Sequence, residues 1–169
     1  MNYMSEKNYI LNKEVTIQKM KRMALELAEQ LSGDTEPIII IGILNSGKVI
    51  ADFVGAKLRE YVPNEVKIIS LSMEKSNPGL ITLSEAIDFN NLHVVIADDV
   101  TNSGRTLLYA LKPLMEFYPK SIQTLVLVER MHKLFPVKPD YVGLSVSTTL
   151  QEHIQVEVED GEIIGAYVV

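Results

Sequence analysis

The feature that most constrains the fold is the stretch of residues 94–107, which has the sequence VVIADDVTNSGRTL. It opens with an unbroken apolar run, which is typical of a strand buried on both faces of a parallel sheet. Asp98 and Asp99 follow directly, and a short loop rich in hydroxyl groups then leads into a helical pattern. Ligands of open α/β sheets bind at the carboxyl ends of strands, where the next helix begins. The stretch therefore predicts an α/β fold with a binding site after this strand.

The residue types of this loop indicate what the site binds. Backbone N–H groups and hydroxyls at the start of a helix suit a phosphate, and paired carboxylates suit sugar hydroxyls or Mg²⁺. We therefore predict a site for a phosphorylated sugar, in which Asp98 and Asp99 face the sugar. The alternative is a solvated strand end followed by an ordinary capped helix. The predicted phosphate contacts are Thr101, Asn102, Ser103, Gly104, Arg105 and Thr106.

The rest of the chain alternates between apolar strands and helical patterns up to about residue 128, and then changes to short strands. This order predicts one α/β domain over residues 1–169, an open parallel sheet flanked by helices with a small antiparallel piece at the end. Asp160 and Gly161 favour a type I′ hairpin turn within that piece. The predicted helices cover residues 17–31, 49–58 and 107–118, and the predicted strands cover 37–41, 66–73, part of 80–91, 94–97, 122–128, 141–146, 153–158 and 162–168.

Composition excludes several classes of function. The chain has no cysteine, which rules out disulfides, thiolate chemistry and cysteine-based zinc sites. Its start lacks the features of a signal peptide, and no apolar run is long enough to span a bilayer. We therefore expect a cytoplasmic protein with no membrane contact. The net charge of −6 argues against a broad nucleic-acid surface, although a local basic patch is compatible with it.

A second glycine-bounded loop, residues 42–48, follows the first long apolar strand and spells G-x-x-x-x-G-K. This is close to a nucleotide-binding P-loop, but Val49 occupies the position where a Ser or Thr would ligate magnesium. An ordinary strand-to-helix turn is another interpretation. We favour a second oxyanion loop that faces the first. Its predicted contacts are Leu44, Asn45, Ser46 and Gly47.

Residues 94–107 resemble the phosphoribosyl-diphosphate motif of type I phosphoribosyltransferases, in which an apolar strand, two acids and a Ser/Thr-Gly-Lys/Arg-Thr turn occur in order. The tail VERMHKLFPVKPDYVGLSVST is similar to the end of the pyrimidine attenuation regulators that have uracil phosphoribosyltransferase activity. The resemblance covers most of the chain and extends in part to hypoxanthine-guanine phosphoribosyltransferases. It implies a five-stranded parallel core, a small hood that holds the base, and a strained or cis peptide in the 44–47 loop.

The resemblance also implies a reaction, the Mg²⁺-dependent transfer of ribose 5-phosphate from phosphoribosyl diphosphate to a nucleobase. Residues 101–106 would hold the 5-phosphate, and residues 44–47 the diphosphate. Asp98 and Asp99 would hold the ribose hydroxyls and the metal, with Asn102 as a further catalytic residue. The expected base or pyrophosphate contacts are Lys75, Arg130, Tyr141 and Val142.

Three departures from the resembled families leave a second hypothesis open. Asn102 replaces an aspartate of the oxopurine enzymes, only Glu74 and Lys75 stand where the regulators have a Tyr-Arg flap, and residues 42–47 contain no basic residue. Each change removes charge from the reaction site. The alternative is therefore a catalytically weakened nucleotide-sensing regulator that binds RNA of pyrimidine genes. Uracil is the favoured base, with other bases open.

We also expect a homodimer or a higher homo-oligomer. The predicted helices carry more apolar residues than one sheet face requires, and a partner would cover the excess. The residues that suggest this are Met20, Met23, Phe53 and Val54.

Overall fold

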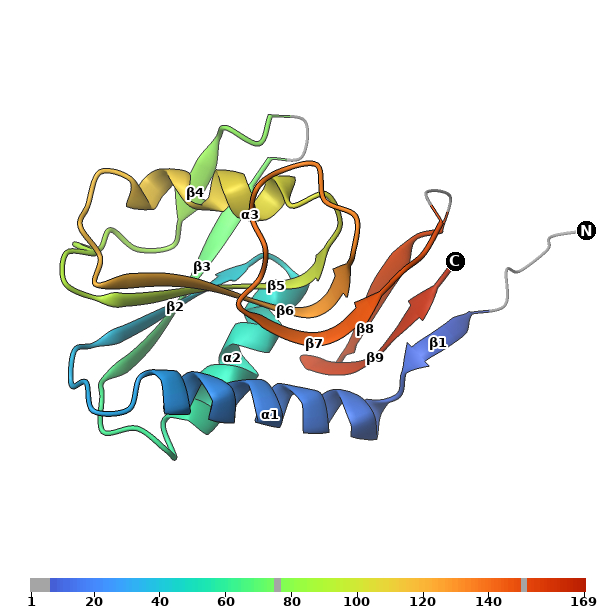
Figure 1. The fold of residues 1–169 in the computed structure, drawn as a ribbon, viewed down its shortest axis with the longest axis horizontal. Coiled ribbons are helices and arrows are strands. Elements are labelled where there is room, and N and C mark those ends of the chain that lie inside the picture. The colour runs from blue at the N-terminus through green and yellow to red at the C-terminus, as the bar shows by residue number, and fades with distance from the viewer. Residues whose placement is uncertain (1–6, 75–76, 150–151) are drawn as a thin grey trace, which may run out of the picture.

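The computed structural model describes residues 7–74, 77–149 and 152–169. Its main sheet has six strands in the order β4-β3-β2-β5-β6-β7 (Figure 1). Neighbouring strands from β3 to β7 run parallel, and only the edge strand β4 is antiparallel to its neighbour. This is the five-stranded parallel core that was predicted. The strands are β2 (Ile38–Ile43), β3 (Val66–Met73), β4 (Ile81–Leu83), β5 (His93–Thr101), β6 (Ser121–Arg130) and β7 (Tyr141–Val146).

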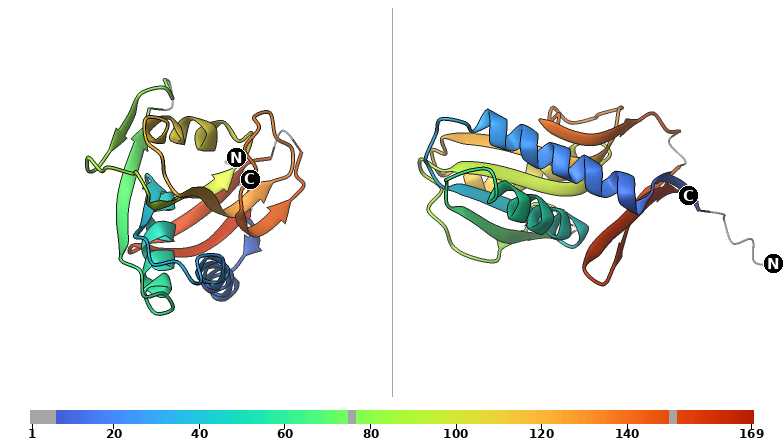
Figure 2. Two further views of the ribbon diagram at one scale, coloured as in Figure 1. Left: turned by 60° about the vertical axis from the view of Figure 1, so that its left-hand side comes forward. Right: turned by 90° about the horizontal axis from the view of Figure 1, so that it is seen from below.

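Helices cover both faces of this sheet (Figure 1, Figure 2). Helices α1 (Lys13–Gln30) and α2 (Ser46–Leu58) pack on one face, and α3 (Arg105–Ala110) with the 3₁₀ helix η1 (Lys112–Leu114) lies on the other. Every residue of β2 is buried, because its side chains alternate between the two faces. Ile38 and Ile40 join the core under α1 and α2, whereas Ile39 and Ile41 join the core under α3.

A second, antiparallel sheet lies beside the main one and forms the hood (Figure 1). It has the strand order β1-β9-β8, with β1 (Asn8–Leu11), β8 (Ile154–Glu159) and β9 (Glu162–Val168). Asp160 and Gly161, between β8 and β9, both have positive φ angles, of 51° and 75°, as a type I′ turn requires. The predicted fold class is confirmed.

Three details of the prediction are wrong. The helix expected to reach residue 118 ends at Ala110, because Pro113 lacks the N–H that an α-helix needs, and the chain continues in the tighter turn of η1. β7 was assigned to the antiparallel piece but pairs parallel with β6 in the main sheet. β1 was not predicted, and it joins the hood by pairing with β9.

The surfaces that suggested a dimer are largely internal. Met20, Met23 and Val54 are at most 2% exposed, so they form the core between α1, α2 and the sheet. Phe53 is only partly buried and, with Ile17, lines a groove of about 180 Å³ between the two helices and the hood. The homodimer stays a prediction that now depends on this groove. No helix of the described residues is long and apolar enough to cross a membrane.

Candidate active site

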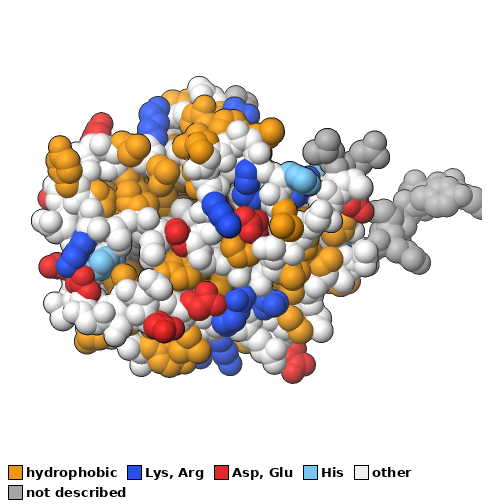
Figure 3. Space-filling view, in the orientation of Figure 1, with side chains coloured by type: hydrophobic (Ala, Val, Ile, Leu, Met, Phe, Trp, Pro, Cys, Tyr) orange, Lys and Arg blue, Asp and Glu red, His pale blue; other side chains and the backbone are white. Residues whose placement is uncertain are grey.

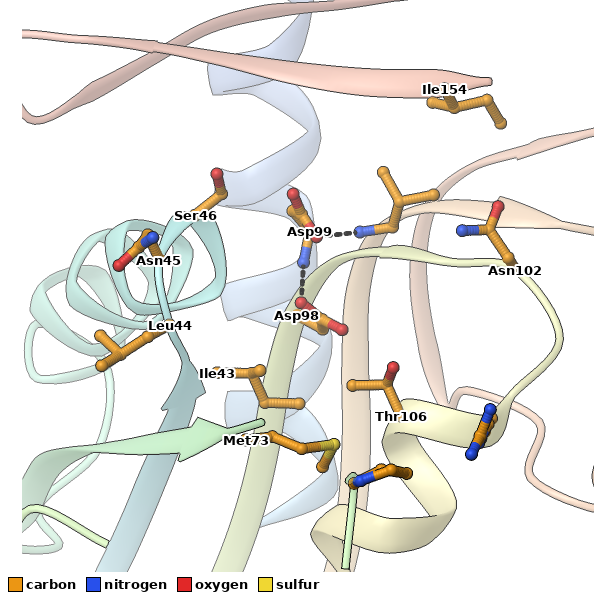
Figure 4. A pocket seen from close by; sticks show the side chains of 13 residues that line it. Ile43, Leu44, Asn45, Ser46, Met73, Asp98, Asp99, Asn102, Thr106 and Ile154 are labelled. Atoms are coloured by element: carbon orange, nitrogen blue, oxygen red, sulfur yellow. Dashed lines mark hydrogen bonds between the residues drawn. The ribbon is translucent and has the colours of Figure 1, made fainter. Parts of the chain in front are cut away.

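The main cavity lies where the topology of an open sheet predicts it. β2 is flanked by β3 on one side and β5 on the other, so the loops after β2 and β5 leave a crevice between them. A cavity of about 540 Å³, called the first cavity below, occupies this position (Figure 4). Its lining residues are Ile43, Leu44, Asn45, Ser46, Met73, Pro78, Asp98, Asp99, Val100, Asn102, Arg105, Thr106 and Ile154.

The two acids stand at the centre of this cavity (Figure 4). β5 continues through them to Thr101, so backbone pairing holds both in place. Asp98 Oδ1 accepts a 2.8 Å hydrogen bond from the Asp99 N–H, and Asp99 Oδ1 accepts one of 2.7 Å from the Val100 N–H. Burial, and next the charge of Asp99, raise the pKa of the Asp98 carboxyl well above its usual range. A cationic ligand would favour the ionised form of this pair.

The 44–47 loop forms a second wall and begins α2. The Leu44–Asn45 peptide bond is cis, as the resemblance led us to expect. Figure 4 shows the Asn45 and Ser46 side chains on the side of the cavity opposite Asn102. A Cβ at Gly47 would lie 2.8 Å from the Ala97 carbonyl oxygen, so only glycine lets this loop come so close to β5.

The P-loop interpretation does not fit this geometry. Lys48, which would reach phosphates in a P-loop, forms a 2.7 Å ion pair with Asp52 along α2 and is not a lining residue of the first cavity. Val49 offers no hydroxyl for a metal either.

The 101–106 loop forms the third wall, but only part of it faces the cavity. Asn102, Arg105 and Thr106 line it, and Arg105 is the only Lys or Arg among the described lining residues. Thr101 is 4% exposed and lies within the fold. Gly104 has a φ of +88°, which favours glycine and turns the chain into α3.

The remaining predicted contacts lie elsewhere. Arg130 and Ser103 line a neighbouring cavity, and Lys75 is outside the described residues. The structure does not bring Tyr141 and Val142 to the cavity, contrary to the prediction. They begin β7, and because β7 runs parallel to β6, its start lies at the edge of the sheet opposite the cavity.

Both of these residues have other partners there. The Tyr141 hydroxyl donates a 2.9 Å hydrogen bond to Gln123, and Arg22 of α1 donates one of 2.9 Å to the Val142 carbonyl oxygen. The resemblance suggested that they contact the base or the pyrophosphate, but the direction of β7 puts them at the other edge of the sheet.

Five lining residues were missed, and all are apolar. Four of them follow or end strands that were predicted, so the carboxyl ends of those strands were the available signal. Ile154 comes from the hood and lies across the cavity from the acids (Figure 4), and nothing in the sequence pattern brings it there. The missed residues are Ile43, Met73, Pro78, Val100 and Ile154.

Comparison with known proteins agrees with this geometry. The model of the phosphoribosyl transferase domain matches residues 10–160. The Bifunctional protein PyrR of Corynebacterium diphtheriae is 31% identical, with 93% of this chain and 92% of the relative covered. The protein of the same name from Latilactobacillus sakei is 30% identical, with 82% and 84% covered. The hypoxanthine phosphoribosyltransferase of Trypanosoma cruzi has a similar fold, with a TM-score of 0.79, 17% identity and 95% of each chain covered.

Proposed function

The chain belongs to the phosphoribosyltransferase family, and we propose that it transfers ribose 5-phosphate from phosphoribosyl diphosphate to a nucleobase, releasing pyrophosphate. The observation that carries this proposal is the first cavity, where Asp98 and Asp99 stand between the 44–47 and 101–106 loops. We propose uracil as the first base to test, because the tail resembles the pyrimidine regulators. We further propose that residues 1–169 act as one domain, in the cytoplasm.

Each wall of the cavity suits one part of the donor substrate. Arg105 and the Thr106 hydroxyl can donate to the 5-phosphate, and the two carboxylates can accept from the ribose hydroxyls. The 44–47 loop, on the opposite side, would hold the diphosphate. Binding the two ends of the donor on separate walls fixes the carbon between them, and this positioning is a large part of catalysis in such transfers.

Magnesium fits this site as a partner of the substrate. Among the described residues no cluster of three or more His, Cys, Asp or Glu could hold a metal ion. Mg²⁺ commonly binds through one or two carboxylates together with substrate phosphates and water, so Asp98 and Asp99 would supply the protein's share. The ion would neutralise charge that develops on the departing pyrophosphate.

The protein's own residues would do the rest. The transition state has oxocarbenium character, so Asp98 and Asp99 lie where negative charge stabilises it. Asn102 reaches the cavity from the side of the 101–106 loop and can both donate and accept hydrogen bonds. It can therefore orient the incoming base, although it cannot take up a proton as an aspartate would.

Calorimetry with phosphoribosyl diphosphate and Mg²⁺ tests the site. Asp99→Asn removes one carboxylate charge, and a hydrogen bond to a charged group contributes about 1.5–3 kcal/mol, so we expect roughly 10- to 100-fold weaker binding. Gly104→Val should weaken binding as strongly, because valine is strained at a φ of +88°. Asp160→Asn, in the hairpin turn where asparagine tolerates positive φ, is the matched control. Wild-type affinity in Asp99→Asn would refute the site.

A turnover screen identifies the acceptor. Uracil, orotate, adenine, guanine, hypoxanthine and xanthine would each be supplied with phosphoribosyl diphosphate and Mg²⁺, and release of pyrophosphate measured. We expect turnover with uracil. Turnover with none of the six bases, despite tight binding of the donor, would favour the second candidate.

That second candidate is an RNA-binding regulator that senses nucleotides in the same cavity. The word "bifunctional" in the names of the relatives motivates it. On the face shown in Figure 3, basic and acidic side chains are interspersed and form no continuous basic stripe. Filter binding with pyrimidine-operon leader RNA at low salt is the test, because phosphate contacts make RNA retention salt-sensitive. No nucleotide-dependent retention would leave the enzyme as the sole candidate.

A further inference from the structure

Arg105 is the cation that the first cavity offers to an anionic ligand, since it is the only Lys or Arg among the described lining residues. It is exposed, and none of the ion pairs within the described part of the chain includes it. A long side chain without a partner samples many rotamers, and ordering it on binding lowers the affinity. A contact that holds the guanidinium before the ligand arrives would therefore strengthen binding.

Tyr109 makes such a contact. Both residues belong to α3 and stand four positions apart, so their side chains lie on the same face of the helix. Arg105 Cζ lies 5.8 Å from the centroid of the Tyr109 ring. At this distance the face of an aromatic ring attracts a guanidinium. Tyr109 is partly buried whereas Arg105 is exposed, so the ring is the more fixed of the two groups and restricts the arginine.

An aromatic ring holds an arginine differently from a carboxylate. A carboxylate would accept hydrogen bonds from the guanidinium and neutralise its charge. A ring face carries no net charge, so it attracts the guanidinium without neutralising it and leaves the N–H groups free to donate. Those N–H groups form a fork that suits the oxygens of a phosphate. The contact with Tyr109 can therefore orient Arg105 and preserve its capacity to bind an anion.

We propose that Tyr109 is a positioning residue that holds the Arg105 guanidinium in place for the 5-phosphate of the donor substrate. This inference rests on the proposed function, which assigns that phosphate to the 101–106 loop. Tyr109 is not one of the described residues that line the first cavity, so it acts through Arg105 and does not touch the substrate. The aromatic ring, and not the hydroxyl, supplies the effect.

Calorimetry with ribose 5-phosphate measures the contribution of the ring. Tyr109→Leu removes the ring and keeps an apolar residue that favours a helix. We expect this variant to bind about three- to tenfold more weakly than the wild type. Tyr109→Phe keeps the ring and should bind within about twofold of the wild type. Wild-type affinity in Tyr109→Leu would overturn the inference, and so would an equal loss in both variants, which would assign the effect to the hydroxyl.

A double-mutant cycle tests whether Tyr109 acts through Arg105. The ligand is phosphoribosyl diphosphate with Mg²⁺, and Arg105→Met removes the guanidinium. In the Arg105→Met background, Tyr109→Leu should lower the affinity by less than about twofold, because the contact that it breaks is already absent. An equal loss in both backgrounds would overturn the inference. If urea unfolding shows that Tyr109→Leu does not fold, Tyr109→Met takes its place, since methionine also lacks the ring.

A second ligand and a second tyrosine separate positioning from a general distortion of the cavity. Pyrophosphate with Mg²⁺, which the proposed function assigns to the 44–47 loop, should bind Tyr109→Leu within about twofold of the wild type. Tyr118→Leu is the matched control, because Tyr118 is 86% exposed and does not line the first cavity. It should bind ribose 5-phosphate as the wild type does. Equal losses for ribose 5-phosphate and pyrophosphate in Tyr109→Leu would overturn the inference.

The same titrations keep this inference apart from the proposed function. If the wild-type protein binds neither ribose 5-phosphate nor phosphoribosyl diphosphate, the proposed function itself fails. If the wild type binds both ligands and Tyr109→Leu binds them equally well, only the role of Tyr109 is refuted.

Discussion

Lys133 anchors the segment that supports the 101–106 loop. Its Nζ lies 3.2 Å from Glu129 Oε1 and also donates to the Arg130 carbonyl oxygen. The next two residues, Leu134 and Phe135, donate backbone hydrogen bonds of 3.0 Å each to the Ser103 carbonyl oxygen. The ion pair thus fixes the turn after β6, and the two backbone hydrogen bonds hold this turn to the loop that we assign to the phosphate.

The cost of breaking this ion pair can be estimated from its burial. The Lys133 and Glu129 side chains are 17% and 10% exposed. Removing one partner of a fully buried pair costs about 3–5 kcal/mol, whereas an exposed pair contributes about 0–1 kcal/mol. For Lys133→Met we expect a loss of roughly 2–3 kcal/mol in the free energy of unfolding, because among the described residues the Glu129 carboxylate would keep only the Ser145 hydroxyl, at 3.0 Å.

The double variant separates a lost attraction from an uncompensated charge. Glu129→Gln combined with Lys133→Met removes both charges of this pair, so the stability of the double variant should return to within about 1 kcal/mol of the wild type. Urea unfolding of the wild type, both single variants and the double variant measures this. Lys57→Met, which breaks an exposed pair with Glu60, should change stability by no more than about 0.5 kcal/mol.

Two results would refute this account of Lys133. One is a loss below about 1 kcal/mol in Lys133→Met. The other is a double variant that is no more stable than the single. Calorimetry tests whether Lys133 also positions the 101–106 loop. If the loop is displaced in Lys133→Met, the affinity for phosphoribosyl diphosphate should fall about tenfold.

Two further predictions concern the acids and the assembly. The pKa of Asp98 is raised in the folded state, so the folded protein loses stability as the pH rises above the unfolded pKa of about 3.8 and this carboxyl ionises. Asp98→Asn should therefore have a higher urea midpoint than the wild type at pH 8, with a smaller difference at pH 4. An equal or lower midpoint at pH 8 would contradict this. Light scattering coupled to size exclusion should give about twice 18.9 kDa for a homodimer that covers the groove at Phe53, and a mass close to 18.9 kDa would mean a monomer.

The sequence predicts the central strands well because burial on both faces leaves an unbroken apolar run. The apolar runs locate β2, β5 and β6, although each of these strands extends beyond its run. Outside the centre, β3, β7 and β9 begin and end where the pattern placed them. The pairing of β7 was wrong, because a short strand with mixed burial carries no signal for its neighbour or its direction. The helix after Gly104 was predicted too long, because the apolar spacing that continues to Leu114 outweighed the local effect of Pro113.

For the site, the sequence identified the loops but not all of the side chains that face the ligand. Asp98 and Asn102, from the end of β5, line the first cavity together with Asn45, from the loop after β2, as expected, because β2 and β5 are adjacent parallel strands. Residues contributed by the hood depend on how two sheets pack, and no local pattern encodes that arrangement. Ile154 was missed for this reason.

The charges around the first cavity give a reason for the proposed dependence on Mg²⁺. Among the described lining residues of the first cavity, Arg105 is the only Lys or Arg beside two aspartates, and Lys48 is occupied by Asp52. A pyrophosphate leaving group would add more negative charge, so under the proposed function a divalent cation would arrive with the substrate. An aspartate in place of Asn102 would add a further negative charge to a cavity that already has few positive ones. The neutral amide thus suits the proposed site, in which the protein would position the donor and the metal would supply the missing positive charge.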